Sequence, residues 1–121
     1  MVDLRRAIGL LLSRSDVDPK RIAFVGHSFG AQFGAILTVV DKRMATSVLM
    51  AGLGSSADLW LNSDDPDEVE RRQSVGVEAF KKELEVTGVL DGIRFVPYAA
   101  PVPVLFQFAK YDHFSVDSMR A

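Results

Sequence analysis

Residues 26–30, Gly-His-Ser-Phe-Gly, have the spacing G-x-S-x-G, which places a serine hydroxyl between two glycines. Such a serine is a nucleophile when the chain turns sharply from a strand into a helix, because the turn strains the backbone at Ser28 and exposes its hydroxyl. Gly26 and Gly30 would let neighbouring backbone approach without a clash against Cβ. The backbone N–H of Phe29 would point toward the negative oxygen that develops when a carbonyl is attacked. The spacing therefore predicts acyl-transfer chemistry on Ser28.

A second interpretation of Ser28 is structural, because serine is one of the preferred N-cap residues of helices. As an N-cap, its side chain would accept a hydrogen bond from the first turn of the helix instead of serving as a nucleophile. The elements on either side of the serine help to separate the two interpretations. The chemical interpretation requires a buried strand before Ser28 and a buried helix after it.

The residues around Ser28 meet this requirement. Residues 21–26 form a short apolar run that predicts a strand, and the small and apolar residues from 28 to about 40 predict a buried helix. Two further apolar runs, 45–51 and 104–109, predict two more strands. Continuous apolar strands of this kind are typical of a parallel sheet that is covered on both faces.

Predicted helices alternate with these strands. The N-terminal residues predict an amphipathic helix, and its buried stripe is Leu4, Ile8, Leu11 and Leu12. A later helix is expected to begin at Asp65 as N-cap, with Pro66 in the first helical position and Glu68 completing a capping box. The residues expected on the buried side of that helix are Val77, Phe80 and Leu84. The alternating order predicts an α/β fold with three parallel strands and crossover helices, in one domain over residues 1–121.

Two segments of the chain resemble α/β-hydrolases. VDPKRIAFVGHSFGA is similar to the nucleophile-elbow region of that superfamily, especially of its dienelactone-hydrolase and prolyl-oligopeptidase-like branches. PVPVLFQFAKYDHFSV resembles the strand and loop that carry the acidic member of the catalytic triad. The resemblance implies a partial α/β-hydrolase fold in which Ser28 is the nucleophile and Asp112 the acid. The N–H of Phe29 matches one of the two oxyanion donors of the family. Asp117 is the nearest alternative to Asp112 as the acid.

The resemblance also implies parts that this sequence does not carry. In the family the catalytic histidine follows a further strand beyond the acid, and the second oxyanion donor precedes the first helix. The chain is therefore expected to be a truncated central portion, with feeble ester hydrolysis or none. His27 and His113 adjoin Ser28 and Asp112 directly, so neither is expected to be the base. His27 is expected to pack or to form a hydrogen bond beneath the turn. The strand over 21–26 would be an exposed edge, which favours homo-oligomers.

The composition limits the other classes of function. The 121 residues carry a net charge of −2 and include no cysteine, so we expect neither nucleic-acid binding nor disulfides. Apolar runs are too short for a membrane span, and the cytoplasm is the expected compartment. No cofactor and no metal is expected, because the acidic residues at the predicted helix start form a solvated charge cluster. That cluster is Asp64, Asp65, Asp67 and Glu68.

Two functions remain from the sequence. The first is a serine hydrolase that acts on an ester or related acyl bond, with a small ester or peptide as substrate. The second is a non-catalytic remnant or interaction module that keeps half of the hydrolase sheet. Nothing in the sequence selects among peptide, ester and lactone bonds.

Overall fold

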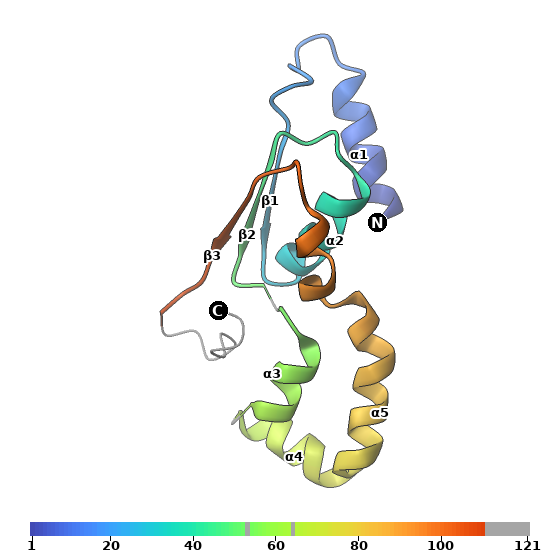
Figure 1. Ribbon diagram of the computed structural model, residues 1–121, viewed down its shortest axis with the longest axis vertical. Helices are drawn as coiled ribbons and strands as arrows, with labels where there is room; N and C mark the ends of the chain where they lie inside the picture. Colours follow the sequence, from blue (N-terminus) through green and yellow to red (C-terminus); the bar gives the residue numbers. More distant parts are fainter. Residues whose placement is uncertain (53, 64, 111–121) are drawn as a thin grey trace.

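The computed structural model describes residues 1–52, 54–63 and 65–110 of the chain. Three parallel strands form one open sheet in the order β1-β2-β3, as Figure 1 shows. Their bounds are Ala23–His27 for β1, Thr46–Met50 for β2 and Val104–Gln107 for β3. The predicted α/β fold with three parallel strands is therefore confirmed, and each strand is shorter than the apolar run that predicted it.

Helices connect the strands. The α-helices are α1 Val2–Leu12, α2 Phe29–Val40, α3 Ser56–Asn62, α4 Pro66–Val75 and α5 Val77–Thr87. Three short 3₁₀ turns, Gly88–Leu90, Gly92–Arg94 and Val96–Tyr98, lead from α5 toward β3. None of the helices in the described residues is long and apolar enough to cross a bilayer.

The helix predicted to start at Asp65 is two helices in the structure. Asp65 is the N-cap of α4, because its carboxylate accepts a 3.0 Å hydrogen bond from the N–H of Asp67. The predicted capping box is wrong, since the N–H of Asp65 donates to the hydroxyl of Ser63 rather than to Glu68. Gly76, at φ 84°, ends α4 and turns the chain into α5. The break leaves Val77 exposed, in contrast to its predicted burial.

Helix α2 packs on the sheet through its small residues. Ala31 and Ala35 are buried against Leu49 of β2. A Cβ on Gly34 would lie 2.3 Å from the ring of Phe24, so any larger residue at this contact would force the Phe24 ring to move. Ala and Gly on one face of a helix let its axis approach the sheet closely. The approach fixes the height of α2, and therefore of its first residues, above β1.

Helix α1 packs against the C-terminal part of α2. Ile8 is buried with Leu37 and Met44, and Leu4 and Leu12 pack partly against the same group. Leu11 is exposed, which corrects its predicted place in the stripe. Leu4, Ile8 and Leu12 lie four residues apart and form one row along the helix, and Leu11 falls beside that row.

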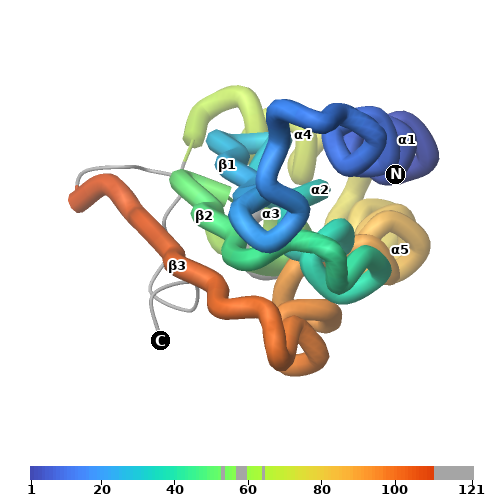
Figure 2. Tube along the Cα trace, turned by 90° about the horizontal axis from the view of Figure 1, so that it is seen from above, coloured from blue at the N-terminus to red at the C-terminus, as the bar shows by residue number. Residues whose placement is uncertain are grey.

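The second face of the sheet is open in the part of the chain that the structure describes. Figure 2 shows α1, α2 and α5 on one side of the strands. On the other side Val25, Val48 and Leu105 stand in register across the sheet. Val25 is 61% exposed and Leu105 59%. Strand β1 is also an edge strand of this sheet, with a single neighbouring strand among the described residues, as expected from the sequence.

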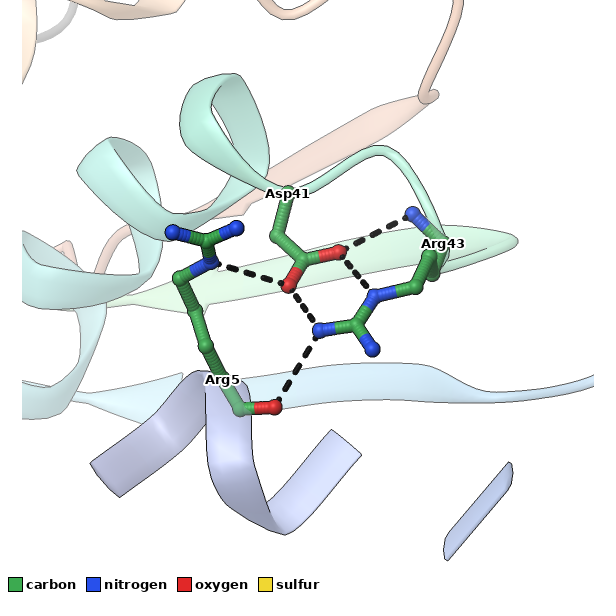
Figure 3. A network of polar contacts seen from close by, with 3 residues as sticks. All are labelled: Arg5, Asp41 and Arg43. Carbon is green, nitrogen blue, oxygen red and sulfur yellow. Dashed lines mark hydrogen bonds and ion pairs between the residues drawn. The ribbon is translucent and has the colours of Figure 1, made fainter. Parts of the chain in front are cut away.

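A buried carboxylate ties α1 to the turn between α2 and β2. Asp41 follows the last residue of α2, and its side chain is 2% exposed (Figure 3). Its Oδ1 accepts from Arg43 Nε at 2.7 Å, and its Oδ2 accepts from Arg5 Nε at 3.4 Å and from Arg43 Nη2. Arg43 Nη2 also donates to the backbone carbonyl of Arg5 at 3.1 Å. The hydrogen bonds from Arg43 lower the pKa of Asp41 from 3.8 to about 2.

We predict that Asp41→Asn lowers the free energy of unfolding at pH 7 by about 2 kcal/mol, because a depressed carboxyl pKa stabilises the folded state where the group is ionised. This contribution is fully present above the unfolded pKa and is lost as the pH falls through the folded pKa near 2. The difference between wild type and variant should therefore shrink between about pH 4 and pH 2.

Denaturant titrations across that pH range measure the effect. Asp16→Asn is the matched control, since the exposed Asp16 also pairs with an arginine, Arg14, at 2.6 Å. We expect the control to change stability far less, because exposed ion pairs contribute little. A pH-independent loss in Asp41→Asn would contradict the prediction.

Candidate active site

Ser28 occupies the turn between β1 and α2, with φ 52° and ψ −119°. This is a backbone conformation that residues with a Cβ rarely adopt. The N–H of Ser28 donates to the carbonyl of Met50 at 2.9 Å, and its carbonyl accepts from Ala31 at 3.0 Å. The turn is thus held from the neighbouring strand and from the helix that follows. The predicted strained conformation of Ser28 is confirmed.

The side chain of Ser28 does not serve as a helix cap. Ser28 is in the N-cap position of α2, yet its hydroxyl makes no capping hydrogen bond to the described start of the helix. The residue is exposed at the surface. A serine kept for capping would accept from the first turn in a relaxed conformation. The described geometry therefore does not support the capping interpretation of Ser28.

The two glycines of the motif have different surroundings. A Cβ on Gly26 would lie 2.5 Å from the carbonyl oxygen of Gly30 and 2.7 Å from the ring of Phe24. Gly26 must therefore lack a side chain, as expected. A Cβ on Gly30 would meet no described atom within 4 Å. Gly30 takes part in the close contact with Gly26 through its backbone carbonyl. A Cβ on Gly30 would clash with none of the described residues.

We predict opposite effects for two matched substitutions. Gly26→Ala should lower the free energy of unfolding by about 1–3 kcal/mol, because the new methyl group overlaps backbone that cannot rotate away. Gly30→Ala should be neutral or stabilise by up to about 1 kcal/mol, since alanine is the better helix former. Chemical denaturation of both variants measures the difference. Equal losses in the two variants would contradict the assigned contacts.

Phe29 begins α2 directly after the serine. The first N–H groups of a helix have no acceptor within the helix, so the N–H of Phe29 is a donor at its positive end. Phe29 is 68% exposed, and its ring meets the ring of Phe33 edge to face, at 4.9 Å between centroids. The N–H of Phe29 thus lies at the positive end of α2, and its side chain covers the outer surface of the helix.

The C-terminal ends of the three strands form one edge of the sheet. Ser28 N–H donates to Met50 at the end of β2, and Ala51 N–H donates to Gln107 at the end of β3 at 2.8 Å. The chain therefore leaves β3 on the edge where Ser28 lies. Asp112, its rival Asp117, and His113 lie outside the described residues. Their predicted places stay predictions.

Two further features of this edge were missed by the sequence analysis. Ala51 has φ 46°, the second strained position beside Ser28. A Cβ on Gly52 would lie 2.7 Å from Cβ of Ala31, so the chain leaving β2 passes close to α2. From the sequence, Ala51 is expected to be an ordinary strand residue, because alanine gives no indication of a positive φ.

His27 is exposed, which corrects the expectation that it packs beneath the turn. Side chains alternate along a strand, so His27 shares the open face of the sheet with Val25, while Gly26 faces α2. Among the described residues no three or more His, Asp or Glu side chains gather where they could hold a metal ion.

We predict that Ser28→Gly raises the free energy of unfolding by about 1 kcal/mol. Glycine adopts the conformation at Ser28 without the strain of about 1–3 kcal/mol, and its greater freedom when unfolded offsets about 0.5–1 kcal/mol. Ser28→Ala keeps the Cβ and should not stabilise. Ser74→Gly, inside α4, should destabilise by about 0.5 kcal/mol. Thermal and urea denaturation compare the three, and a Ser28→Gly variant less stable than wild type would refute the strain.

Comparisons with known proteins give a fold. Neither models of protein families nor curated protein sequences match the chain. Among solved structures the chain is similar to an acetyl xylan esterase from Paenibacillus sp. R4, with a TM-score of 0.61 and 17% sequence identity. The match covers 98% of this chain and 48% of that chain, so this chain spans about half the esterase's length. The α/β fold is thus similar to that of an esterase.

Proposed function

We propose that this chain carries the nucleophile of a serine hydrolase that cleaves an ester or related acyl bond. The observation that carries the proposal is the conformation of Ser28, φ 52° and ψ −119°, with a hydroxyl that does not cap α2. Strain of this kind persists where surrounding contacts impose it, and it clusters at functional sites. The similarity to an esterase fold supports the same conclusion.

The proposed reaction proceeds through an acyl-enzyme. The Ser28 oxygen forms a bond to the acyl carbon and gives its proton to a base, which passes the proton to the departing alkoxide as the ester bond breaks. Water then adds to the acyl carbon, the bond to the serine oxygen breaks, and that oxygen regains a proton. The products are the carboxylic acid and the alcohol.

Charge stabilisation would come from the start of α2. The N–H of Phe29 would donate to the tetrahedral oxyanion, and the positive end of the helix adds a favourable field. One such donor contributes about 10²–10³ in turnover. Gly26 supports this donor indirectly, because its close contact with Gly30 sets where α2 begins.

The base would come from outside the described residues. A base must reach within about 3.2 Å of the serine oxygen. His27 precedes Ser28 and lies on the open face of the sheet, which argues against it. We propose Asp112 as the acid that orients the base, because the chain leaves β3 on the edge that holds Ser28.

The open sheet supports a second candidate function, an interaction module without catalysis. Strand β1 is an edge of the described sheet, and Val25, Val48 and Leu105 form an apolar row across its open face. Exposed edges pair with strands of other chains, a second copy included. The two candidates differ in whether removing the Ser28 hydroxyl changes any chemical rate.

We predict that hydrolysis of 4-nitrophenyl esters depends on Ser28 when a base is supplied. Imidazole added to the buffer can act as that base, so the wild-type rate should exceed the Ser28→Ala rate by at least about tenfold at the same imidazole concentration. The variant in the same buffer corrects for hydrolysis by imidazole itself. Release of nitrophenolate measures both rates.

Other results of this assay would distinguish a hydrolase from an interaction module. A Ser28-dependent rate without imidazole would show that the chain supplies a base, and His113→Ala and His27→Ala would then identify it. Equal rates for wild type and Ser28→Ala under every condition would overturn the hydrolase proposal. The interaction module would then be the function that the structure supports.

A further inference from the structure

The segment that leaves β2, residues 50–52, contacts the turn at Ser28 on both sides. On one side the carbonyl of Met50 accepts a hydrogen bond from the N–H of Ser28 at 2.9 Å. On the other side the carbonyl of Ser28 accepts from the N–H of Ala31 at 3.0 Å, and Gly52 lies against Ala31. This segment therefore holds the N–H of Ser28 directly and borders the residue of α2 that holds its carbonyl.

The peptide group between Met50 and Ala51 is fixed from two sides. Its carbonyl accepts from the serine, and its N–H donates to the carbonyl of Gln107 on β3 at 2.8 Å. Because a peptide group is planar and rigid, the two hydrogen bonds fix one plane between the neighbouring strands. Ala51 then has φ 46°. The chain has only this residue in which to pass from the fixed plane to the contact of Gly52 with Ala31.

The contact between Gly52 and Ala31 has no room for another atom. A Cβ on Gly52 would lie 2.7 Å from Cβ of Ala31, which is 2% exposed. Carbon atoms in contact stand about 3.5–4.0 Å apart, so the two segments would have to separate by about 1 Å. A Cβ moves only with its backbone. Movement of residues 51–52 would disturb the carbonyl that holds the N–H of Ser28, and movement of α2 would disturb the N–H that holds its carbonyl.

We propose that Gly52 and Ala31 are positioning residues, which keep Ser28 in its reactive conformation by setting the distance between the end of β2 and the start of α2. The inference rests on the proposed function, in which Ser28 is the nucleophile. Phe29, whose N–H is the proposed oxyanion donor, lies between Ser28 and Ala31 in the chain, so the same distance affects the donor. A misplacement of about 1 Å can cost about 100-fold in rate.

The test is Gly52→Ala, with Gly9→Ala in α1 as the matched control. A Cβ on Gly9 would lie 3.8 Å from Nη1 of Arg43, an ordinary contact, so the control adds the same methyl group without a clash. The control should change neither the conformation of Ser28 nor any rate that depends on it. Chemical denaturation of both variants gives the folded fraction to which each measurement is corrected.

Hydrogen exchange, measured by NMR, reports the turn without any turnover. The amide hydrogens of Ser28 and Ala31 each report one of the two hydrogen bonds that hold the serine. In Gly52→Ala we expect at least one of them to exchange about tenfold faster, because its hydrogen bond is weakened. The amide of Leu37, in the second half of α2, should change no more than the global stability requires. Unchanged exchange at Ser28 and Ala31 would overturn the proposal.

Removal of the methyl group of Ala31 should rescue Gly52→Ala. With that Cβ gone, the new Cβ would next meet the carbonyl carbon of residue 31 and the backbone nitrogen of Gln32, both at 3.5 Å. The double variant Gly52→Ala/Ala31→Gly should therefore exchange as slowly at Ser28 as Ala31→Gly alone, the reference that carries the lower helix propensity of glycine. A double variant that exchanges as fast as Gly52→Ala would contradict the proposed contact.

Turnover separates this proposal from the function on which it rests. With imidazole as the base, Gly52→Ala should lower the Ser28-dependent rate at least about tenfold, and the double variant should regain the rate of Ala31→Gly. A wild-type rate that Gly52→Ala keeps, with exchange unchanged, overturns the positioning role and leaves the hydrolase intact. A wild type without any Ser28-dependent rate overturns the hydrolase, and with it the role of Gly52 and Ala31 in catalysis.

Discussion

Helix α2 lies so close to β1 that other atoms fill the space where a Cβ would stand at two of the glycines. The carbonyl of Gly30 occupies the position of a Cβ on Gly26, and the ring of Phe24 occupies the position of a Cβ on Gly34. The chain has one residue, Ser28, in which to pass from the strand into a helix held this close. Its positive φ follows from that restriction, and the hydrogen bond from Ser28 to Met50 fixes the turn to the sheet.

The same approach shapes both faces of α2. Alanine and glycine of α2 face the sheet. The large side chains of α2 lie on its other side, where Phe29 and Phe33 meet edge to face. Both rings also border a pocket between α2 and the helices that follow β2. The small residues of α2 therefore face the sheet, and its large aromatic side chains face away from the sheet.

Much of this arrangement could be predicted from sequence because its signals are local. The apolar run before Gly26, the small residues after Ser28 and the Asp65 N-cap each predict the element that the structure shows. The break at Gly76 has a local signal, because glycine readily adopts a positive φ and commonly ends helices, but the apolar residues beyond it suggested one continuous helix. The strain at Ala51 depends on how distant segments pack, and alanine does not specify it. The pocket that Phe29 and Phe80 both line was missed for the same reason, since these residues are about fifty positions apart in the sequence. Asp112, in contrast, rests on resemblance and on the direction of β3.

Helix α4 is held differently from the elements around it. None of its residues is buried, and Arg72 fastens it by donating to the carbonyls of Trp60 and Ser63. Segments with few buried apolar contacts open at a small fraction of the global unfolding free energy. Helix α4 is therefore expected to open locally while β1, β2 and α2 stay folded. Hydrogen exchange at the amides of α4 is then governed by the stability of one polar helix rather than by that of the sheet.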